Sequence, residues 1–149
     1  MLVGSRLVAM TIRLNPYISF KNNAREAIEF YHSVFGGELT INTFADLHAS
    51  QDPSDDNLIM HSMLVAPNGL TLMASDTTQR MAYTPGDNMS VSLSGEAEDE
   101  ETLTGYWTGL MVGGTEAMPL SKATWGDSFG MGTDKYGITW LVNIAAPQA

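Results

Sequence analysis

The sequence contains one nine-residue segment twice, in closely similar form. Residues 68–76 are NGLTLMASD, and residues 136–144 are YGITWLVNI. The two segments align without gaps, so that Gly69 corresponds to Gly137. A single match of this length can be coincidence, so its meaning depends on whether the rest of the chain is doubled too.

Two further pairs of segments repeat in the same order. NPYISF at 15–20 resembles NMSVSL at 88–93, and FYHSVFGG at 30–37 resembles YWTGLMVGG at 106–114 with one insertion. An internal duplication explains all three pairs at once, whereas coincidence must explain each pair separately. The chain is therefore predicted to contain two copies of one module, at about residues 12–76 and 86–145.

Hydrophobic periodicity predicts the same order of elements, β-α-β-β-β, in both copies. The first helix has Asn23 and Glu26 placed as in a capping box, and Gly36 at its end. In the first copy we expect a strand at 14–20, a helix at 22–37, a polar loop at 46–57, and strands at 39–45, 58–66 and 70–75. In the second copy, after a linker at 76–87, we expect a strand at 88–94, a helix at 96–114, and strands near 115–120, 124–130 and 138–144.

Composition narrows the class of protein. The chain has 149 residues, of which 44% are hydrophobic, enough for a packed core. Its net charge is −10 and its few basic residues are scattered, which argues against a nucleic-acid partner. It has no cysteine and no apolar run of membrane-spanning length. We expect a cytoplasmic protein without a membrane partner, in which residues 1–9 are an N-terminal extension, Met10 is a candidate start, and 10–149 form one domain.

Four segments resemble the PhnB-like branch of the vicinal-oxygen-chelate superfamily, which includes glyoxalase I, extradiol dioxygenases and bleomycin resistance proteins. They are NPYISF…AREAIEFYHSVFGGEL, IMHSMLVAPNGLTLMASD, GDNMSVSLSG and, above all, WGDSFGMGTDKYGITWLVN at 125–143. The resemblance implies an α+β, glyoxalase-like fold in which two βαβββ modules form a half-open eight-stranded barrel around a cavity, with the helices outside. It also implies a homodimer, with the modules paired either within one chain or across two chains.

Alternation along the strands separates an apolar face from a mixed face. The apolar face, which includes Leu72 and Trp140, is predicted to pack under the helices. The mixed face is predicted to line the ligand cavity. The candidate ligand-binding residues are Asn15, Tyr17, His61, Met73, Ser75, Asn88, Ser90, Trp125, Phe129 and Leu141. For Trp125 and Phe129, packing at a glycine-rich strand bend is the alternative.

Metal-dependent members of the superfamily carry His or Glu ligands on the first and last strands of each module. The resemblance places these positions at Asn15, Met73, Asn88 and Leu141. Amide, thioether and alkyl groups stand there, whereas divalent cations need carboxylate or imidazole donors. We therefore expect no metal at this site, and no other cofactor.

Among the three histidines, His61 is the best candidate for a general acid or base, because imidazole titrates near neutrality. It lies in phase with Ile59 and Met63 along its predicted strand. The alternative is a buried or edge histidine with a backbone partner. His32 is expected at a helix edge and His48 in a solvated loop.

We therefore expect a homodimer that binds a small organic molecule without the usual divalent metal, and we leave open whether it catalyses a reaction. The alternatives are a metal-dependent enzyme of glyoxalase or dioxygenase type with unorthodox ligands, and a drug-sequestering resistance protein. Methyltransferase activity is disfavoured, because no cofactor-binding glycine motif follows a predicted strand.

Overall fold

The computed structural model describes residues 12–148, so the predicted extension and Met10 lie outside the described residues. The first module contains β1 (Tyr17–Phe20), α2 (Ala24–Phe35), β2 (Glu38–Thr43), the 3₁₀ helix η1 (Pro53–Asp55), β3 (Ile59–Val65) and β4 (Thr71–Asp76). The second contains β5 (Val91–Gly95), the 3₁₀ helix η2 (Ala97–Asp99), α3 (Glu100–Leu110), β6 (Thr115–Lys122), β7 (Ser128–Thr133) and β8 (Thr139–Ile144).

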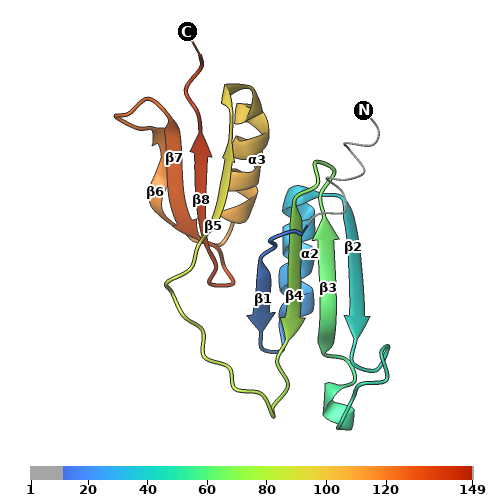
Figure 1. Cartoon of the computed structure of the whole chain (residues 1–149). Coiled ribbons are helices and arrows are strands. Elements are labelled where there is room, and N and C mark those ends of the chain that lie inside the picture. The colour runs from blue at the N-terminus through green and yellow to red at the C-terminus, as the bar shows by residue number, and fades with distance from the viewer. Residues whose placement is uncertain (1–11, 149) are drawn as a thin grey trace, which may run out of the picture.

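Each module builds one four-stranded sheet (Figure 1). Sheet 1 has the strand order β1-β4-β3-β2 and sheet 2 the order β5-β8-β7-β6. In each sheet the first strand pairs in parallel with the last, and the other neighbours are antiparallel. The identical topology confirms the predicted α+β fold class with two βαβββ modules.

The repeated segments form the same hairpin in both modules. The N–H of Gly69 donates to the carbonyl of Ala66 at 2.8 Å, and the N–H of Gly137 donates to the carbonyl of Asp134 at 3.0 Å. Both glycines have positive φ, 92° and 90°, a conformation that other residues rarely adopt. The correspondence equates Ala66 with Asp134, so the second module carries a carboxylate where the first carries a methyl group.

Helix α2 buries the face that its apolar spacing predicts, with Ala24, Ala27, Ile28, Tyr31 and Phe35 buried. The predicted capping box is wrong, because the side chain of Asn23 makes no cap hydrogen bond. The N–H of Ala24 instead donates to Oδ1 of Asp76 at 3.0 Å, and Oδ2 of Asp76 accepts from the N–H of Ile59 at 2.9 Å. The buried carboxylate of Asp76, at the end of β4, thus accepts two backbone hydrogen bonds. Its negative charge lies at the positive N-terminal end of the α2 dipole, where it is stabilising.

The two modules share one core, and α2 lies between them. This helix contacts β2, β3 and β4 of its own module and also contacts α3. The rings of Tyr31 and Phe35 lie 5.7 Å and 5.8 Å from the ring of Trp140 on β8. Trp140 is 1% exposed, which confirms its predicted place on the apolar face. Both sheets therefore turn their apolar faces toward the helices and their other faces away from the shared core.

A buried carboxylate joins the modules at this contact. Asp134 is 4% exposed, and its Oδ2 accepts from the hydroxyl of Tyr31 at 2.5 Å and from the indole N–H of Trp140 at 2.9 Å. Its Oδ1 accepts from the backbone N–H groups of Tyr136 and Ile138. Burial, and then the neighbouring Asp134 carboxylate, raise the pKa of Tyr31 far above its ordinary value. The phenol therefore remains protonated and acts as the donor.

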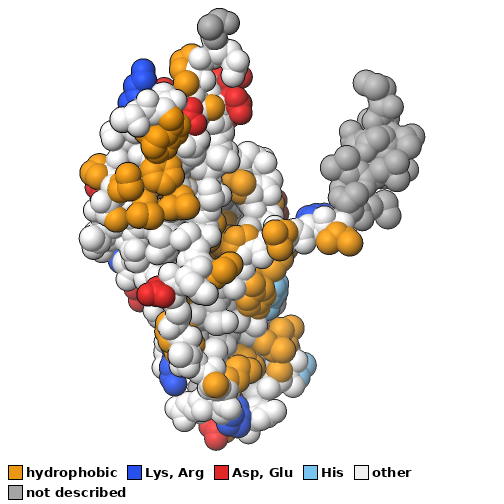
Figure 2. Space-filling view, turned by 60° about the vertical axis from the view of Figure 1, so that its left-hand side comes forward, with side chains coloured by type: hydrophobic (Ala, Val, Ile, Leu, Met, Phe, Trp, Pro, Cys, Tyr) orange, Lys and Arg blue, Asp and Glu red, His pale blue; other side chains and the backbone are white. Residues whose placement is uncertain are grey.

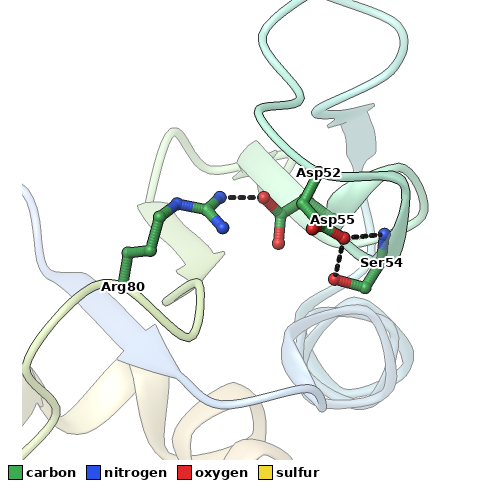
Figure 3. A network of polar contacts seen from close by, with 4 residues as sticks. All are labelled: Asp52, Ser54, Asp55 and Arg80. Carbon is green, nitrogen blue, oxygen red and sulfur yellow. Dashed lines mark hydrogen bonds and ion pairs between the residues drawn. The ribbon is translucent and has the colours of Figure 1, made fainter.

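An ion pair fixes the loop before β3 to the linker between the modules (Figure 3). The guanidinium of Arg80, in the linker, contacts Oδ2 of Asp55, which is 1% exposed in η1. Asp52 caps η1 by accepting from the N–H and the hydroxyl of Ser54. The polar segment predicted as a loop is thus held by specific contacts. No helix in the described part of the chain is long and apolar enough to cross a membrane.

Candidate functional site

The candidate site begins on the face of sheet 1 that turns away from α2. In Figure 1, α2 lies behind β3 and β4, so this face turns toward the viewer. We call it the open face of sheet 1. Strand register and alternation place Tyr17, His61, Met63, Met73 and Ser75 on it. All five are exposed or half-buried, whereas Ser62, Leu72 and Ala74 on the opposite face are buried.

Tyr17 and His61 form a pair across β4. The hydroxyl of Tyr17 lies 3.1 Å from Nδ1 of His61, and the two rings stack with centroids 5.8 Å apart and an interplanar angle of 29°. The contact spans β4, which lies between β1 and β3 in the sheet. The phenol thus partners one ring nitrogen of His61, the group that the sequence nominates as a general acid or base.

A register shift near His61 corrects one part of the sequence prediction. Asn42 pairs with His61, but Thr43 pairs with Ile59, because β3 bulges between these two pairs. Ile59 therefore turns into the core, where it is 1% exposed, while His61 stays half-buried on the open face. The predicted common face of His61 and Ile59 is wrong, whereas His61 and Met63 do share one face.

The corresponding face of sheet 2 also turns away from the core. We define the open face of sheet 2 by Ser92, Met118, Phe129, Met131, Leu141 and Asn143, which strand register brings together. Trp125, which is 62% exposed, lies beside it with its ring 6.1 Å from that of Phe129. Figure 2 shows hydrophobic side chains gathered on the surface of the second module. The named residues of both open faces carry no formal charge apart from any proton bound by His61.

Besides Trp125, which lies in the turn between β6 and β7, three predicted site residues lie outside the strands. Asn15 precedes β1, while Asn88 and Ser90 precede β5 and are exposed. Asn15 instead lines a cleft of about 270 Å³ between the modules, together with Leu72 and Trp140 of the apolar faces. Both strands begin later than predicted, so the parallel ladder with the last strand starts beyond these residues.

Sequence reasoning missed three methionines of the open faces. Met63 pairs with Met73 on sheet 1, and Met118 pairs with Met131 on sheet 2. The alternation from His61 to Met63 already signalled the first, but the strands near 115–130 show no clean alternation that would have signalled the others.

The other histidines lie apart from this site. His32 is half-buried on α2, and its Nε2 lies 2.9 Å from the carbonyl oxygen of Gly37. His48 is exposed in the loop after β2 and has a positive φ of 53°.

The residues at the positions of the superfamily's metal ligands do not suit a divalent cation. The positions predicted from the resemblance were Asn15, Met73, Asn88 and Leu141, but Asn15 and Asn88 precede their strands, and the first-strand residues that pair with Met73 and Leu141 are Tyr17 and Ser92. Together they offer a phenol, a hydroxyl, a thioether and an alkyl group, whereas such ions prefer carboxylates and imidazoles. Within residues 12–148, no three or more His, Asp or Glu side chains are grouped so that they could hold a metal ion.

A family model described as 3-demethylubiquinone-9 3-methyltransferase matches residues 13–143 of the chain. The crystal structure of protein PA1353 from Pseudomonas aeruginosa is 34% identical in sequence, and the similarity covers 92% of this chain and 100% of that one, with a TM-score of 0.77. These matches span both modules.

Two further solved structures extend the comparison. A putative 3-demethylubiquinone-9 3-methyltransferase, PhnB protein, from Bacillus cereus is 25% identical, covers 90% of this chain and 100% of its own, and has a TM-score of 0.66. A glyoxylase/bleomycin resistance protein/dioxygenase domain from Frankia sp. EAN1pec is 12% identical, covers 94% of this chain and 96% of its own, and has a TM-score of 0.61. At that identity, the second likeness shows the fold alone.

Proposed function

We propose that this chain, which belongs to the 3-demethylubiquinone-9 3-methyltransferase family and has the glyoxalase/bleomycin resistance/dioxygenase fold, binds a small uncharged organic molecule. The observation that carries the proposal is the pair of open faces, one on each sheet. Both are rich in methionine and aromatic side chains, and both hold a few hydroxyl, amide or imidazole groups. Ligand sites commonly combine a mainly apolar lining with a few polar groups that orient the ligand.

The lining favours a flat, neutral ligand. The rings of Tyr17 and His61 on sheet 1, and of Trp125 and Phe129 beside sheet 2, offer faces and edges for stacking. The thioether of Met73 adds a polarisable contact that adapts to ring edges. A charged ligand would find no opposite formal charge among the named residues of the open faces.

A second copy of the chain would complete the site. The shared core uses the apolar faces of both sheets, so the two open faces do not meet within one chain. The strands β1 and β5 lie at sheet edges, and Ile12 and Leu14 just before β1 are fully exposed. If β1 of one copy lay beside β5 of another, the open faces of the two copies would form a half-open eight-stranded barrel with the helices outside.

His61 is the group most able to perform chemistry on such a ligand. Imidazole exchanges protons near neutral pH, and Tyr17 holds the ring at Nδ1. A general acid or base role is therefore the catalytic hypothesis that this site offers.

Methyl transfer, which the family description names, finds no support in a cofactor-binding turn among residues 12–148. The segment between β1 and α2 is Lys21–Asn23, and Glu96 alone separates β5 from η2, so no glycine-rich turn follows either first strand. Such a turn holds the cofactor in the open parallel sheets that bind nucleotides. We therefore do not propose a methyltransferase.

Methionine methyl NMR tests the binding proposal. Protein with ¹³C-labelled methionine methyl groups would be titrated with indole and quinoline, both neutral at pH 7. We expect shift changes at Met63, Met73, Met118 and Met131, and none at Met81 or Met89 of the linker, which are 49% and 80% exposed. Changes confined to the linker, or none with any neutral bicyclic fragment, would refute the proposal.

Sedimentation velocity tests the dimer separately. We expect the wild type to sediment as a dimer and Leu141→Asp to sediment as a monomer, because the charge would enter the interior of the half-open barrel. Met89→Asp serves as a control, because Met89 precedes β5 and is already exposed. If the wild type sedimented as a monomer even at high protein concentration, the dimer part of the proposal would be refuted.

A further inference from the structure

We infer that the open face of sheet 1 binds a soft monovalent metal ion, Cu(I), through the imidazole of His61 and the thioethers of Met63 and Met73. This inference goes beyond the proposed function, because it assigns a metal ion to residues of the same face. It differs from the divalent site of metal-dependent glyoxalase-like enzymes in its ion, its residues and its donor atoms.

Strand register brings the three side chains together. Met63 on β3 pairs directly with Met73 on β4, so their Cβ atoms are separated by about 4.5 to 5.5 Å, as usual for such pairs. His61 lies two residues before Met63 on the same strand and face, diagonal to Met73. Diagonal neighbours are within reach of long side chains. All three are half-buried, so they are shielded yet open to an ion.

Tyr17 supplies the outer partner that a metal-binding histidine requires. A ligating imidazole usually binds the ion through one nitrogen and donates its other N–H to a fixed acceptor, which sets the ring orientation. The oxygen of Tyr17 lies 3.1 Å from Nδ1 of His61. In the tautomer that carries its proton on Nδ1, this nitrogen donates to the phenol oxygen and Nε2 is the nitrogen left to bind an ion.

The donor set selects the ion. Thioethers are soft ligands that favour Cu(I), whereas Mg²⁺ and Ca²⁺ require oxygen ligands. No carboxylate belongs to the five residues that define this face. A monovalent ion also needs less compensating charge than a divalent one in a site built from neutral ligands.

Sheet 2 provides an internal comparison. Met118 pairs with Met131 on its open face, so a thioether pair occurs there too. No histidine belongs to the second module, because the three histidines of the chain are His32, His48 and His61. We therefore assign the ion to sheet 1, where a thioether pair and a partnered imidazole occur together.

Competition for Cu(I) with the chromogenic chelator bicinchoninate, under anaerobic reducing conditions, tests the inference. We expect wild-type protein to remove one Cu(I) per chain from the chelator. Met63→Leu/Met73→Leu should lose this binding, because leucine preserves the apolar volume and so the fold but removes both sulfur atoms. Met81→Leu/Met89→Leu, which removes the same number of thioethers from the linker, should bind like the wild type.

Two further measurements separate ligation from structural effects. Tyr17→Phe should weaken Cu(I) binding by about 10-fold or more, as is usual when the outer partner of a ligating histidine is removed. X-ray absorption of the copper-loaded wild type should show both sulfur and nitrogen ligands. Unchanged binding in Met63→Leu/Met73→Leu, equal loss in the linker control, or a copper spectrum without sulfur would overturn the inference.

The two proposals fail separately. A chain that shifts its methionine methyl signals with indole or quinoline but takes no Cu(I) from bicinchoninate overturns the copper site alone. If the protein takes up Cu(I) but its methionine signals respond to no neutral fragment, the copper site is supported and the proposal of a neutral ligand is refuted.

Discussion

The hydroxyl of Tyr31 donates a 2.5 Å hydrogen bond to Oδ2 of Asp134, although 103 residues separate them in sequence. This bond links helix α2 of the first module to the final hairpin of the second. It depends on a position in that hairpin where the internal copies differ in polarity, Ala66 against Asp134. The two modules are thus similar in fold, and the carboxylate of Asp134, which only the second module carries at this position, helps to join them by binding helix α2.

Loss of this bond should destabilise the whole chain. Tyr31→Phe removes the hydroxyl but keeps the buried ring, so Asp134 loses one of its donors. We expect the free energy of unfolding in urea to fall by about 1.5 to 3 kcal/mol, the usual worth of a hydrogen bond to a charged group. Tyr83→Phe in the linker is the matched control and should change little. Equal stability of Tyr31→Phe and wild type would show that the bond contributes nothing.

Alkaline pH should weaken the contact between the modules. Burial, and then a hydrogen bond from its hydroxyl to Glu26, raise the pKa of Tyr136 to about 12, and the pKa of Tyr31 is raised as well. Because the native pKa is the higher one, the unfolded chain releases these protons first as the pH rises. Their stabilisation is complete below pH 10, the ordinary pKa of a tyrosine side chain, and for Tyr136 it is lost between pH 10 and about pH 12.

Urea unfolding at a series of pH values measures this effect. The wild type should lose stability above pH 10 more steeply than Tyr31→Phe, which lacks one of the two phenols. Parallel pH profiles for the two proteins would contradict the assignment to Tyr31.

The ion pair in Figure 3 should hold the linker between the modules in place. Arg80→Met leaves the carboxylate of Asp55, 1% exposed, without its cationic partner. We expect a loss of about 1 to 3 kcal/mol, the cost of a buried polar group without its partner, and faster proteolysis of the linker. Lys122→Met, on the exposed strand β6, removes the same charge and should have neither effect. Unaltered proteolysis in Arg80→Met would show that the linker is held by other contacts.

Two equivalent glycines should tolerate no side chain. A Cβ atom at Gly37 would lie 2.0 Å from the carbonyl oxygen of Val65, and one at Gly114 would lie 2.4 Å from that of Thr133. Alanine at either position should cost about 3 kcal/mol or more, because the obstacle is backbone. Gly105→Ala in α3, where an added Cβ meets no atom within 4 Å, should instead stabilise by about 0.5 to 1 kcal/mol. Thermal unfolding of the three variants checks both directions.

The sequence alone predicted the repeated βαβββ topology and the family. The three pairs of repeated segments are local, and alternation along a strand is a property of the backbone that needs no tertiary information. The same alternation placed Trp140 and Leu72 in the core, and both are buried. It also placed Tyr17, Met73 and Ser75 on the mixed faces, and strand register brings these three residues to one face.

Only the tertiary structure decided the details that depend on partners far along the chain. Helix α2 starts at the carboxylate of Asp76 rather than at the side chain of Asn23, because the end of β4 packs against the first turn. A bulge opposite Asn42 turns Ile59 inward while His61 remains outward. Neither effect has a local signature, because each arises from where another strand pairs or ends. Sequence periodicity fixes which face of an element is apolar, but the buried contacts of the assembled chain determine which neighbour covers that face and which face is left open.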